Sequence, residues 1–399
     1  MSDAAPGRWR ALALVSLAEL AAMALWFSAS ASLPALVVEW RLGAGGASAL
    51  TLAVQFGFVA GTLAAALLNL PDILDTRRLF AAAALAGAAC NAVFALAASG
   101  LGVGLPLRFL TGVCLAGVYP PGMKLIATWF RSRRGLAIGF LVGALTVGKA
   151  SPYLINAVGG PNWRMNVLAV SAVAVLGGVI VLAAVGQGPY ASPTARFDFG
   201  QAARIFRNRS VRLANLGYFG HMWELYAMWT WAPVMLRASM GGGALAEYGS
   251  FVVLGAGGIG CVAAGWIADR VGRTAVTAGA MALSGLCCLG IGLLYGSNPA
   301  ALLAVAAVWG ATVVADSAQF SACVTELADP RYVGTALTLQ TCLGFLLTTA
   351  SVALVPALVE AVGWRYAFIA LAPGPAFGIW AMLRLRSLPE AERIAGGRR

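Results

Sequence analysis

The stretch ELAAMALW, residues 19–26, has a near copy, ELYAMWTW, at residues 224–231. The two copies share Glu, Leu, Ala, Met and Trp at the same five of eight positions. Each copy lies within a long apolar run, where a glutamate is costly and usually functional. The repeat predicts a duplicated unit and a task for the two glutamates inside it.

The composition indicates which solvent these runs face. Of 399 residues, 60% are hydrophobic and 11% are charged, and the mean hydropathy is +0.83. These values are typical of a membrane protein that crosses the bilayer many times. Twelve apolar runs reach the roughly 20 residues that a spanning helix needs. They lie near 10–38, 47–69, 79–98, 103–127, 135–158, 165–186, 212–236, 249–268, 275–296, 300–323, 333–358 and 365–386.

The positions of the basic residues predict the orientation. With the N-terminus inside, 20 of the 27 Lys and Arg residues fall on the cytoplasmic side and four fall in external loops. The positive-inside rule therefore places both termini in the cytoplasm. We expect an integral protein of the plasma membrane, the inner membrane of a bacterium. The net charge of +12 comes from loops and tails in contact with the lipid bilayer, so that no nucleic-acid partner is expected.

The longest connection divides the chain into two halves of six spans. The predicted organisation is an N-terminal bundle over 1–186, a cytoplasmic linker over 187–211 and a C-terminal bundle over 212–399. Other features recur about 200 residues apart, namely Trp163-Arg164 with Trp364-Arg365, and Pro34 with Pro233. We therefore expect an all-α fold of twelve transmembrane helices in two pseudo-symmetric six-helix bundles.

Three motifs give the sequence a family resemblance. The first, GWIADRVGR, lies at 265–273 after span eight. The second, LPDILDTRR at 70–78, is a partial copy of the first that lacks its glycines. The third, RFLTGVCLAG, lies at 108–117 in span four. With these motifs the chain resembles the major facilitator superfamily of secondary transporters. The resemblance implies a cytoplasmic gating motif in each half. Its residues would be Gly265, Asp269, Arg270, Gly272 and Arg273 in the second half, and Asp72, Arg77 and Arg78 in the first.

The resemblance implies transport by alternating access, with a small-molecule substrate and protons as partners. We expect a monomer without a cofactor, and we do not expect an enzyme. A membrane enzyme would need a nucleophile, a metal site or a paired acid and base, whereas the single His has no metal partners at ligand spacing. The leading interpretation is a proton-coupled symporter of a small organic anion. A proton antiporter that exports amphiphilic compounds and a uniporter remain alternatives.

Glu19, Glu224 and His221 are the candidates for proton coupling. At 1.5 Å per residue, Glu19 and Glu224 lie about 14 and 18 Å from the cytoplasmic ends of their spans, near the middle of the bilayer. His221 is three residues before Glu224 and shares its helix face. The alternative interpretation is that each glutamate is a buried hydrogen-bonding group or the partner of a Lys or Arg.

Lys149 and Arg108 are the cationic candidates for substrate binding. Lys149 lies deep in span five on a glycine-rich stretch, and its counter-charge is either an anionic substrate or a fixed pair with Glu19 or Glu224. Arg108 lies near the external end of span four, where a structural role with span one is the alternative.

The remaining candidates for substrate contact are uncharged. They are Tyr226, Trp223, Gln55 and Gln340. Asp316 and Gln319 of span ten are more typical of hydrogen bonds between packed helices. The prolines of YPPG at 119–122 predict a kink in span four.

Overall fold

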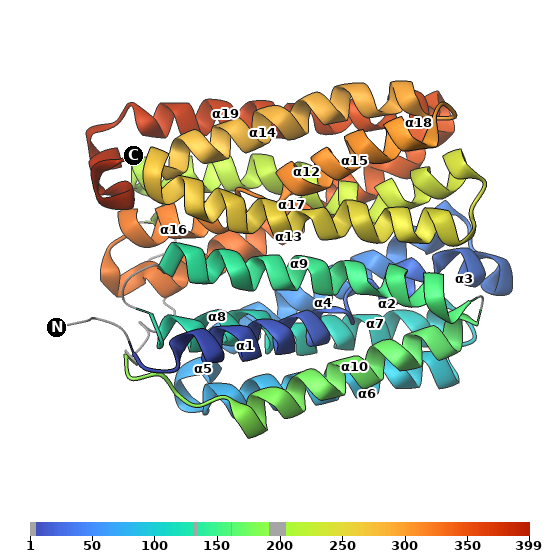
Figure 1. Ribbon diagram of the computed structural model, residues 1–399, viewed down its shortest axis with the longest axis horizontal. Helices are drawn as coiled ribbons and strands as arrows, with labels where there is room; N and C mark the ends of the chain where they lie inside the picture. Colours follow the sequence, from blue (N-terminus) through green and yellow to red (C-terminus); the bar gives the residue numbers. More distant parts are fainter. Residues whose placement is uncertain (1–4, 131–133, 161, 191–204) are drawn as a thin grey trace. The chain divides into compact units, whose positions relative to one another are not determined.

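The computed structural model describes residues 5–130, 134–160, 162–190 and 205–399, and every regular element in these ranges is a helix (Figure 1). The early helices are α1 (Arg8–Met23), α2 (Ser28–Ala31), α3 (Leu33–Trp40), α4 (Ala44–Leu67), α5 (Leu70–Ile73), α6 (Thr76–Ala97), α7 (Leu101–Ala116), α8 (Tyr119–Ala127), α9 (Arg134–Gly159) and α10 (Trp163–Ala184). The later ones are α12 (Arg209–Met240), α13 (Gly243–Val271), α14 (Arg273–Gly290), η1 (Ile291–Leu294), α15 (Pro299–Val313), α16 (Ser317–Leu327), η2 (Pro330–Tyr332), α17 (Val333–Val362), α18 (Trp364–Ala367), η3 (Phe368–Leu371), α19 (Pro373–Arg386) and η4 (Pro389–Gly397).

Ten helices in the described ranges are long and apolar enough to cross a membrane. The two other predicted spans, the first and the seventh, differ from these ten. The first is interrupted, because α1 ends at Met23 and α2 begins only at Ser28. The seventh lies in α12, which is continuous but carries Arg209, Arg212 and Glu224 among its apolar residues.

The chain forms two compact units, Met1–Pro193 with Leu236–Gly255, and Thr194–Met235 with Ala256–Arg399. Residues 191–204 of the predicted linker lie outside the described part of the chain. In the first unit α1 packs on α9 and α10, and α6 lies beside α10 (Figure 1). Glycines permit the close approach of α4 to α7, because a Cβ on Gly57 would collide with the Phe109 carbonyl.

The second unit repeats these contacts. A Cβ on Gly260 of α13 would collide with the carbonyl of Ala311 in α15. This matches the first unit, where a Cβ on Gly57 would collide with the carbonyl of Phe109. Likewise, Gly220 of α12 meets the backbone of α19 at Gly374. The same close approaches therefore recur in the two units.

Three spans contain a break that positions polar groups inside the protein. The first span unwinds over residues 24–27, the fourth between α7 and α8, and the tenth over residues 314–316. The break in the fourth span lies directly before YPPG, so that the predicted kink is confirmed. Each break frees backbone carbonyls that need new partners.

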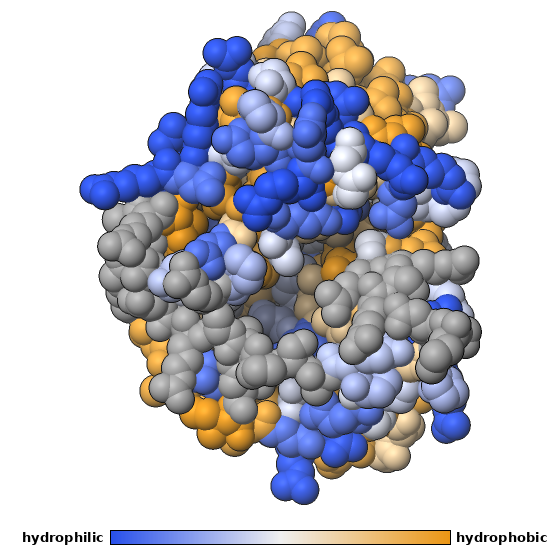
Figure 2. Space-filling view, turned by 90° about the vertical axis from the view of Figure 1, so that its left-hand side faces the viewer, coloured by the Kyte–Doolittle hydropathy of each residue, from blue (hydrophilic) through white to orange (hydrophobic). Residues whose placement is uncertain are grey.

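The surface of the helices is apolar along their length. On α10, Leu176, Val179 and Leu182 are all at least half exposed. Figure 2 shows one end of the helices, where hydrophilic side chains cover much of the face and apolar ones show at its edges. Long helices with exposed apolar flanks are those of an integral membrane protein.

Candidate functional site

Glu19 is a buried carboxylate of the first unit. It lies near the end of α1, and neither carboxylate oxygen has such a partner among the described residues. The backbone of Gly122 in α8 presses against it, because a Cβ at that position would collide with Oε2. Since buried polar atoms normally have partners, Glu19 is suited to take up a proton or a donor from a ligand.

Lys149 lies beside this carboxylate. It is 2% exposed on α9, and its Nζ is 4.0 Å from the ring centroid of Trp26. The neighbouring Gly148 lets α9 approach α1, because a Cβ there would collide with the backbone of Leu20. Lys149 and Glu19 consequently interact electrostatically. The structure thus brings two predicted residues together on an aromatic face.

Arg108 holds the break in the first span. Its Nη2 donates to the carbonyls of Leu25 and Trp26 at 3.0 and 2.6 Å. Its Nη1 donates to Ser28 Oγ at 3.1 Å and to Asn91 Oδ1 at 3.0 Å. The guanidinium, fully buried, therefore satisfies carbonyls that the unwound segment leaves without helical partners. Because that segment carries Trp26, Arg108 positions the ring on which Lys149 lies.

Glu224 occupies the corresponding position in the second unit and has three donors. Trp309 Nε1 donates to Oε1 at 2.5 Å, Cys288 Sγ lies 3.1 Å from the same oxygen, and Ser284 Oγ donates to Oε2 at 2.9 Å. These donors come from α15 and α14. Glu224 therefore ties three helices together, as the structural interpretation of the glutamates expected.

His221 contacts a second acid of the same unit. Its Nδ1 lies 2.9 Å from Asp316 Oδ1, and both side chains are 1% exposed. Asp316 lies in the break of the tenth span, directly before α16. The sequence indicated Asp316 only as a packing residue, and its approach to His221 was not predicted.

The four uncharged candidates lie in packed surroundings. Trp223 Nε1 donates to the Ala370 carbonyl at 3.1 Å, and the Tyr226 ring centroid is 4.9 Å from that of Phe345. Gln340 Oε1 accepts a hydrogen bond of 3.3 Å from Ser321 Oγ. Gln55 is fully buried in α4. Their part in substrate contact stays a prediction.

The signature motif of the second half makes contacts within its own unit. Arg273 Nη1 donates to Gln319 Oε1 at 2.8 Å, and its Nη2 lies 2.8 Å from Glu326 Oε1. Arg270 lies over the Trp266 ring at 3.4 Å from the centroid. Gly265 is buried near the end of α13, and Gly272 has a φ of 97° between α13 and α14. Such a φ favours glycine there.

The C-terminal segment, residues 389–399, covers this motif. Thr274 Oγ1 donates to the Arg399 carbonyl at 3.0 Å, and Arg398 Nη1 donates to the Asp269 carbonyl. The Ala395 N–H donates to Glu326 Oε2 at 3.0 Å. A Cβ on Gly272 would collide with the carbonyls of the segment's last two residues. Nothing in the sequence predicted this docking.

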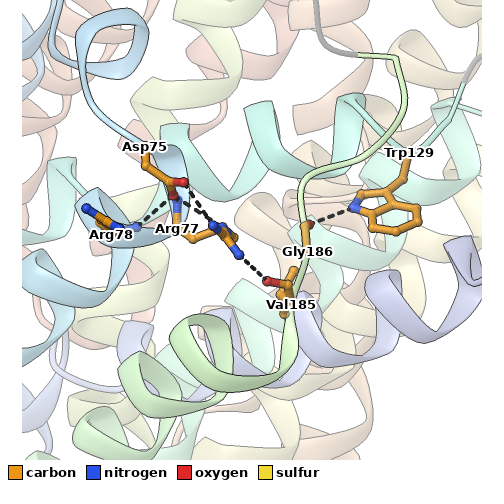
Figure 3. Close-up of polar contacts among 6 residues, drawn as sticks. All are labelled: Asp75, Arg77, Arg78, Trp129, Val185 and Gly186. Carbon is orange, nitrogen blue, oxygen red and sulfur yellow. Dashed lines mark hydrogen bonds and ion pairs between the residues drawn. The ribbon is translucent and has the colours of Figure 1, made fainter.

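The first-half loop uses an aspartate that the prediction did not include (Figure 3). Asp75 caps α6 by accepting from the N–H groups of Arg77 and Arg78 at 2.9 and 3.2 Å. Arg77 Nη2 lies 3.0 Å from Asp75 Oδ2, and Nη1 donates to the Val185 carbonyl at 3.2 Å. The Arg77 guanidinium, followed by the backbone N–H groups, lowers the pKa of Asp75 to about 2. The side chain of Asp72 lies outside the described part.

Metal binding has no support in the described residues. Among them, no three His, Cys, Asp or Glu side chains are grouped so that they could hold a metal ion.

Solved structures with a similar fold are transporters. A mutant form of the nucleoside transporter NupG superposes with a TM-score of 0.70 at 14% identity and covers 94% of this chain and 99% of its own. A bacterial homologue of the human lysosomal transporter Spinster, in an inward-facing and unoccupied conformation, gives 0.69 at 14% identity and covers 96% and 99%. At such identities the likeness shows the fold alone.

Sequence comparison identifies the family. An MFS-type transporter of Gibberella moniliformis (strain M3125 / FGSC 7600) is 27% identical over 229 residues, which are 55% of this chain and 53% of that protein. The chain thus aligns with about half the length of this relative. Residues 15–351 match the Major Facilitator Superfamily. The chain belongs to the Major Facilitator Superfamily, a family of transporters rather than of enzymes.

Proposed function

We propose that this transporter is a proton-coupled symporter of a small organic anion that works by alternating access. It would act as a monomer in the inner membrane of a bacterium, with both termini in the cytoplasm. Lys149 would bind the anion, and Glu19 and Glu224 would bind protons. The observation that carries the proposal is the buried Lys149 ammonium on the Trp26 ring beside a carboxylate without hydrogen-bond partners among the described residues.

The proposal includes twelve spans in two bundles, over 1–186 and 212–399, joined by the linker 187–211. Ten helices are long and apolar enough to span. The interrupted segment α1–α3 and the 32-residue α12 would supply the other two. Glu19 and Glu224 need not prevent insertion of these two segments, because both side chains are buried within the protein.

The pairing of Lys149 with Glu19 links the two ligands. While Glu19 is ionised, it balances the Lys149 charge. When Glu19 takes up a proton, the buried Lys149 ammonium loses the negative charge of this carboxylate, and an anion from solution can replace that charge. Proton and anion binding would then support each other, which is the thermodynamic condition for symport.

The signature motif would serve as a gate latch on the cytoplasmic side. Arg273 makes a bidentate contact with Glu326, at 3.1 Å from Nε and 2.8 Å from Nη2. Asp269 interacts electrostatically with Arg273. Asp269→Asn should therefore slow transport and leave ligand affinity within a few-fold. Collapse of binding in a folded variant would contradict the latch.

Thermal shift against organic acids, amino acids and drugs should first identify a ligand, because selective binding stabilises the folded protein. In liposomes, the wild type should accumulate a stabilising anion under an inward proton gradient. Accumulation should stop in Glu19→Gln and Glu224→Gln, while exchange at equal pH survives. A variant that still accumulates the anion would remove that glutamate from the proton path.

Lys149→Ala tests the anion site itself. It should weaken anion binding at least about tenfold and change the melting temperature of the ligand-free protein little. Lys149→Arg should not fully restore binding, because a planar guanidinium replaces a compact ammonium. Lys124→Ala, which removes a cation from α8, is the matched control. If Lys149→Ala destabilised the ligand-free protein with unchanged affinity, the fixed ion pair would be the correct interpretation.

A further inference from the structure

The pair formed by His221 and Asp316 combines full burial with unused hydrogen-bonding capacity. The 2.9 Å contact joins His221 Nδ1 to Asp316 Oδ1. Among the described residues, His221 Nε2 and both carboxylate oxygens of Asp316 have no hydrogen-bond partner. Each side chain of the pair therefore keeps unused hydrogen-bonding capacity.

The charge balance of the pair depends on one proton. With a neutral imidazole, the pair carries the single negative charge of Asp316 in a buried place. A proton from water that bonds to the Nε2 lone pair converts His221 to imidazolium, which balances the carboxylate without breaking the existing contact. Loss of that proton restores the original state. An unbalanced buried charge is costly. The deprotonated pair, with its net negative charge, is therefore stable only where neighbouring groups or water offset that charge, whereas the protonated pair is neutral and needs no such partner.

The surroundings contain other charged and titratable groups on several elements. Glu224 lies one turn along α12 and interacts electrostatically with Asp316. Cys261 of α13 donates from Sγ to the Val314 carbonyl at 3.4 Å, within the same break. The imidazole also lies between aromatic rings, 5.4 Å from Phe320 and 6.0 Å from Tyr218 between centroids. Further groups on the neighbouring elements are Arg273 and Cys288 on α14, Cys323 on α16 and Gln340 on α17.

A chain of contacts leads from the pair to the signature motif. Gln319 follows Asp316 by three residues on the same helix face, and its Oε1 accepts from Arg273 Nη1 at 2.8 Å. Arg273 in turn pairs with Glu326. A change in the charge of the pair therefore acts at the break in the tenth span. The side chain of Gln319 connects this break to Arg273 of the signature motif.

We propose that His221 and Asp316 together bind and release a coupling proton in the second unit, next to the break in the tenth span. This inference rests on the proposed proton coupling and adds Asp316 to its groups. Glu224, one turn away, keeps its proposed proton site and also holds α12, α14 and α15 together through its three donors.

The chain contains a single histidine, which gives a direct measurement. Protein labelled with ¹⁵N-histidine and purified without a polyhistidine tag should give one imidazole signal pair. The Nε2 signal should change from that of a bare to that of a protonated ring nitrogen as the pH is lowered. In Asp316→Asn the midpoint should move by at least about one pH unit, a tenfold change in proton affinity. Thr325→Val, an exposed position of α16, should leave it unchanged.

A pH-independent signal in the folded wild type, or the same midpoint in Asp316→Asn, would overturn the inference. Transport separates it from the proposed function. If the wild type shows no proton-driven accumulation, the proposed coupling is wrong whatever the imidazole does. If the wild type accumulates the anion under a proton gradient, and His221→Gln and Asp316→Asn accumulate it equally well, only the role of the pair is wrong. We expect both variants to lose at least about tenfold in accumulation and to retain exchange at equal pH.

Discussion

The two copies of the repeated motif lie in helices that differ in continuity. In the first unit the helix unwinds directly after Met23, and Glu19 has no hydrogen-bond partner in the described part of the chain. In the second unit α12 continues through the motif, and Glu224 accepts from three donors. The same eight-residue pattern therefore gives one unit a buried carboxylate with unused hydrogen-bonding capacity. In the other unit it gives a carboxylate whose oxygens accept from three donors.

The difference originates in the helix packed opposite. Phe109 of α7 and Ala311 of α15 occupy matching positions, since the first carbonyl meets Gly57 of α4 and the second meets Gly260 of α13. The residue before them is Arg108 in the first unit and Gly310 in the second. A guanidinium can satisfy the carbonyls of an unwound segment, whereas glycine offers no side chain. The unwinding thus requires a donor from elsewhere in the chain, and only the first unit has it at this position.

The largest effect should come from removing that donor. Arg108→Leu leaves the carbonyls of Leu25 and Trp26 without their buried partner, and it should destabilise the protein by about 3–5 kcal/mol. Thermal unfolding in detergent measures this loss of stability. Arg164→Ala is the control, because its pair with Glu39 is exposed and should contribute under about 1 kcal/mol. Equal losses in the two variants would show that the break does not depend on Arg108.

In the second unit the corresponding test is Trp309→Phe. The ring keeps its packing near Phe368, 5.1 Å away between centroids, but Glu224 loses its shortest hydrogen bond. The free energy of unfolding should fall by about 1.5–3 kcal/mol. Trp380→Phe, at a half-exposed position, should change it far less. If Trp309→Phe no longer lowered the free energy of unfolding in a Glu224→Gln background, the hydrogen bond between Trp309 and Glu224 would be confirmed as the cause of the loss.

The confinement of Glu19 can be measured through Gly122. Gly122→Ala adds a methyl group against Oε2 and should cost about 1–3 kcal/mol. In a Glu19→Ala background most of this cost should disappear, since the two sites are in contact. Gly279→Ala in α14 meets nothing within 4 Å and should stabilise slightly through helix propensity. A cost that persists without Glu19 would mean that the methyl group meets another neighbour.

The smallest effect concerns the first-half loop. Asp75→Asn keeps a capping oxygen but removes the charge that pairs with Arg77, and it should cost up to about 1 kcal/mol at neutral pH. The folded pKa of about 2 lies below the ordinary value of 3.8. The carboxylate therefore stabilises the fold fully above about pH 4, and this contribution is lost as the pH falls through 2. Unfolding of both proteins between pH 7 and 2.5 should show a narrowing difference, whereas a constant difference would contradict the ionised cap.

The sequence predicted the family, the helical class and the kink before YPPG, because each depends on local pattern or on repetition. It also identified Lys149 and Glu19, since charges in apolar runs are conspicuous. It could not predict the unwinding of the first span, which depends on Arg108 some 80 residues away. The partners of Glu224, the contact of His221 with Asp316 and the cap by Asp75 depend equally on how helices approach one another. Spacing along the chain does not encode these distances.

The docking of residues 389–399 has a practical consequence for anyone who labels this protein. The Arg399 carbonyl accepts hydrogen bonds from Thr274 and Arg386, at 3.0 and 3.2 Å, beside the signature motif. A fluorescent protein or affinity tag fused after residue 399 would have to leave directly from this contact. Transport rates recorded with such a fusion would report a perturbed motif, and a short cleavable spacer would be needed before the tagged and untagged proteins can be compared.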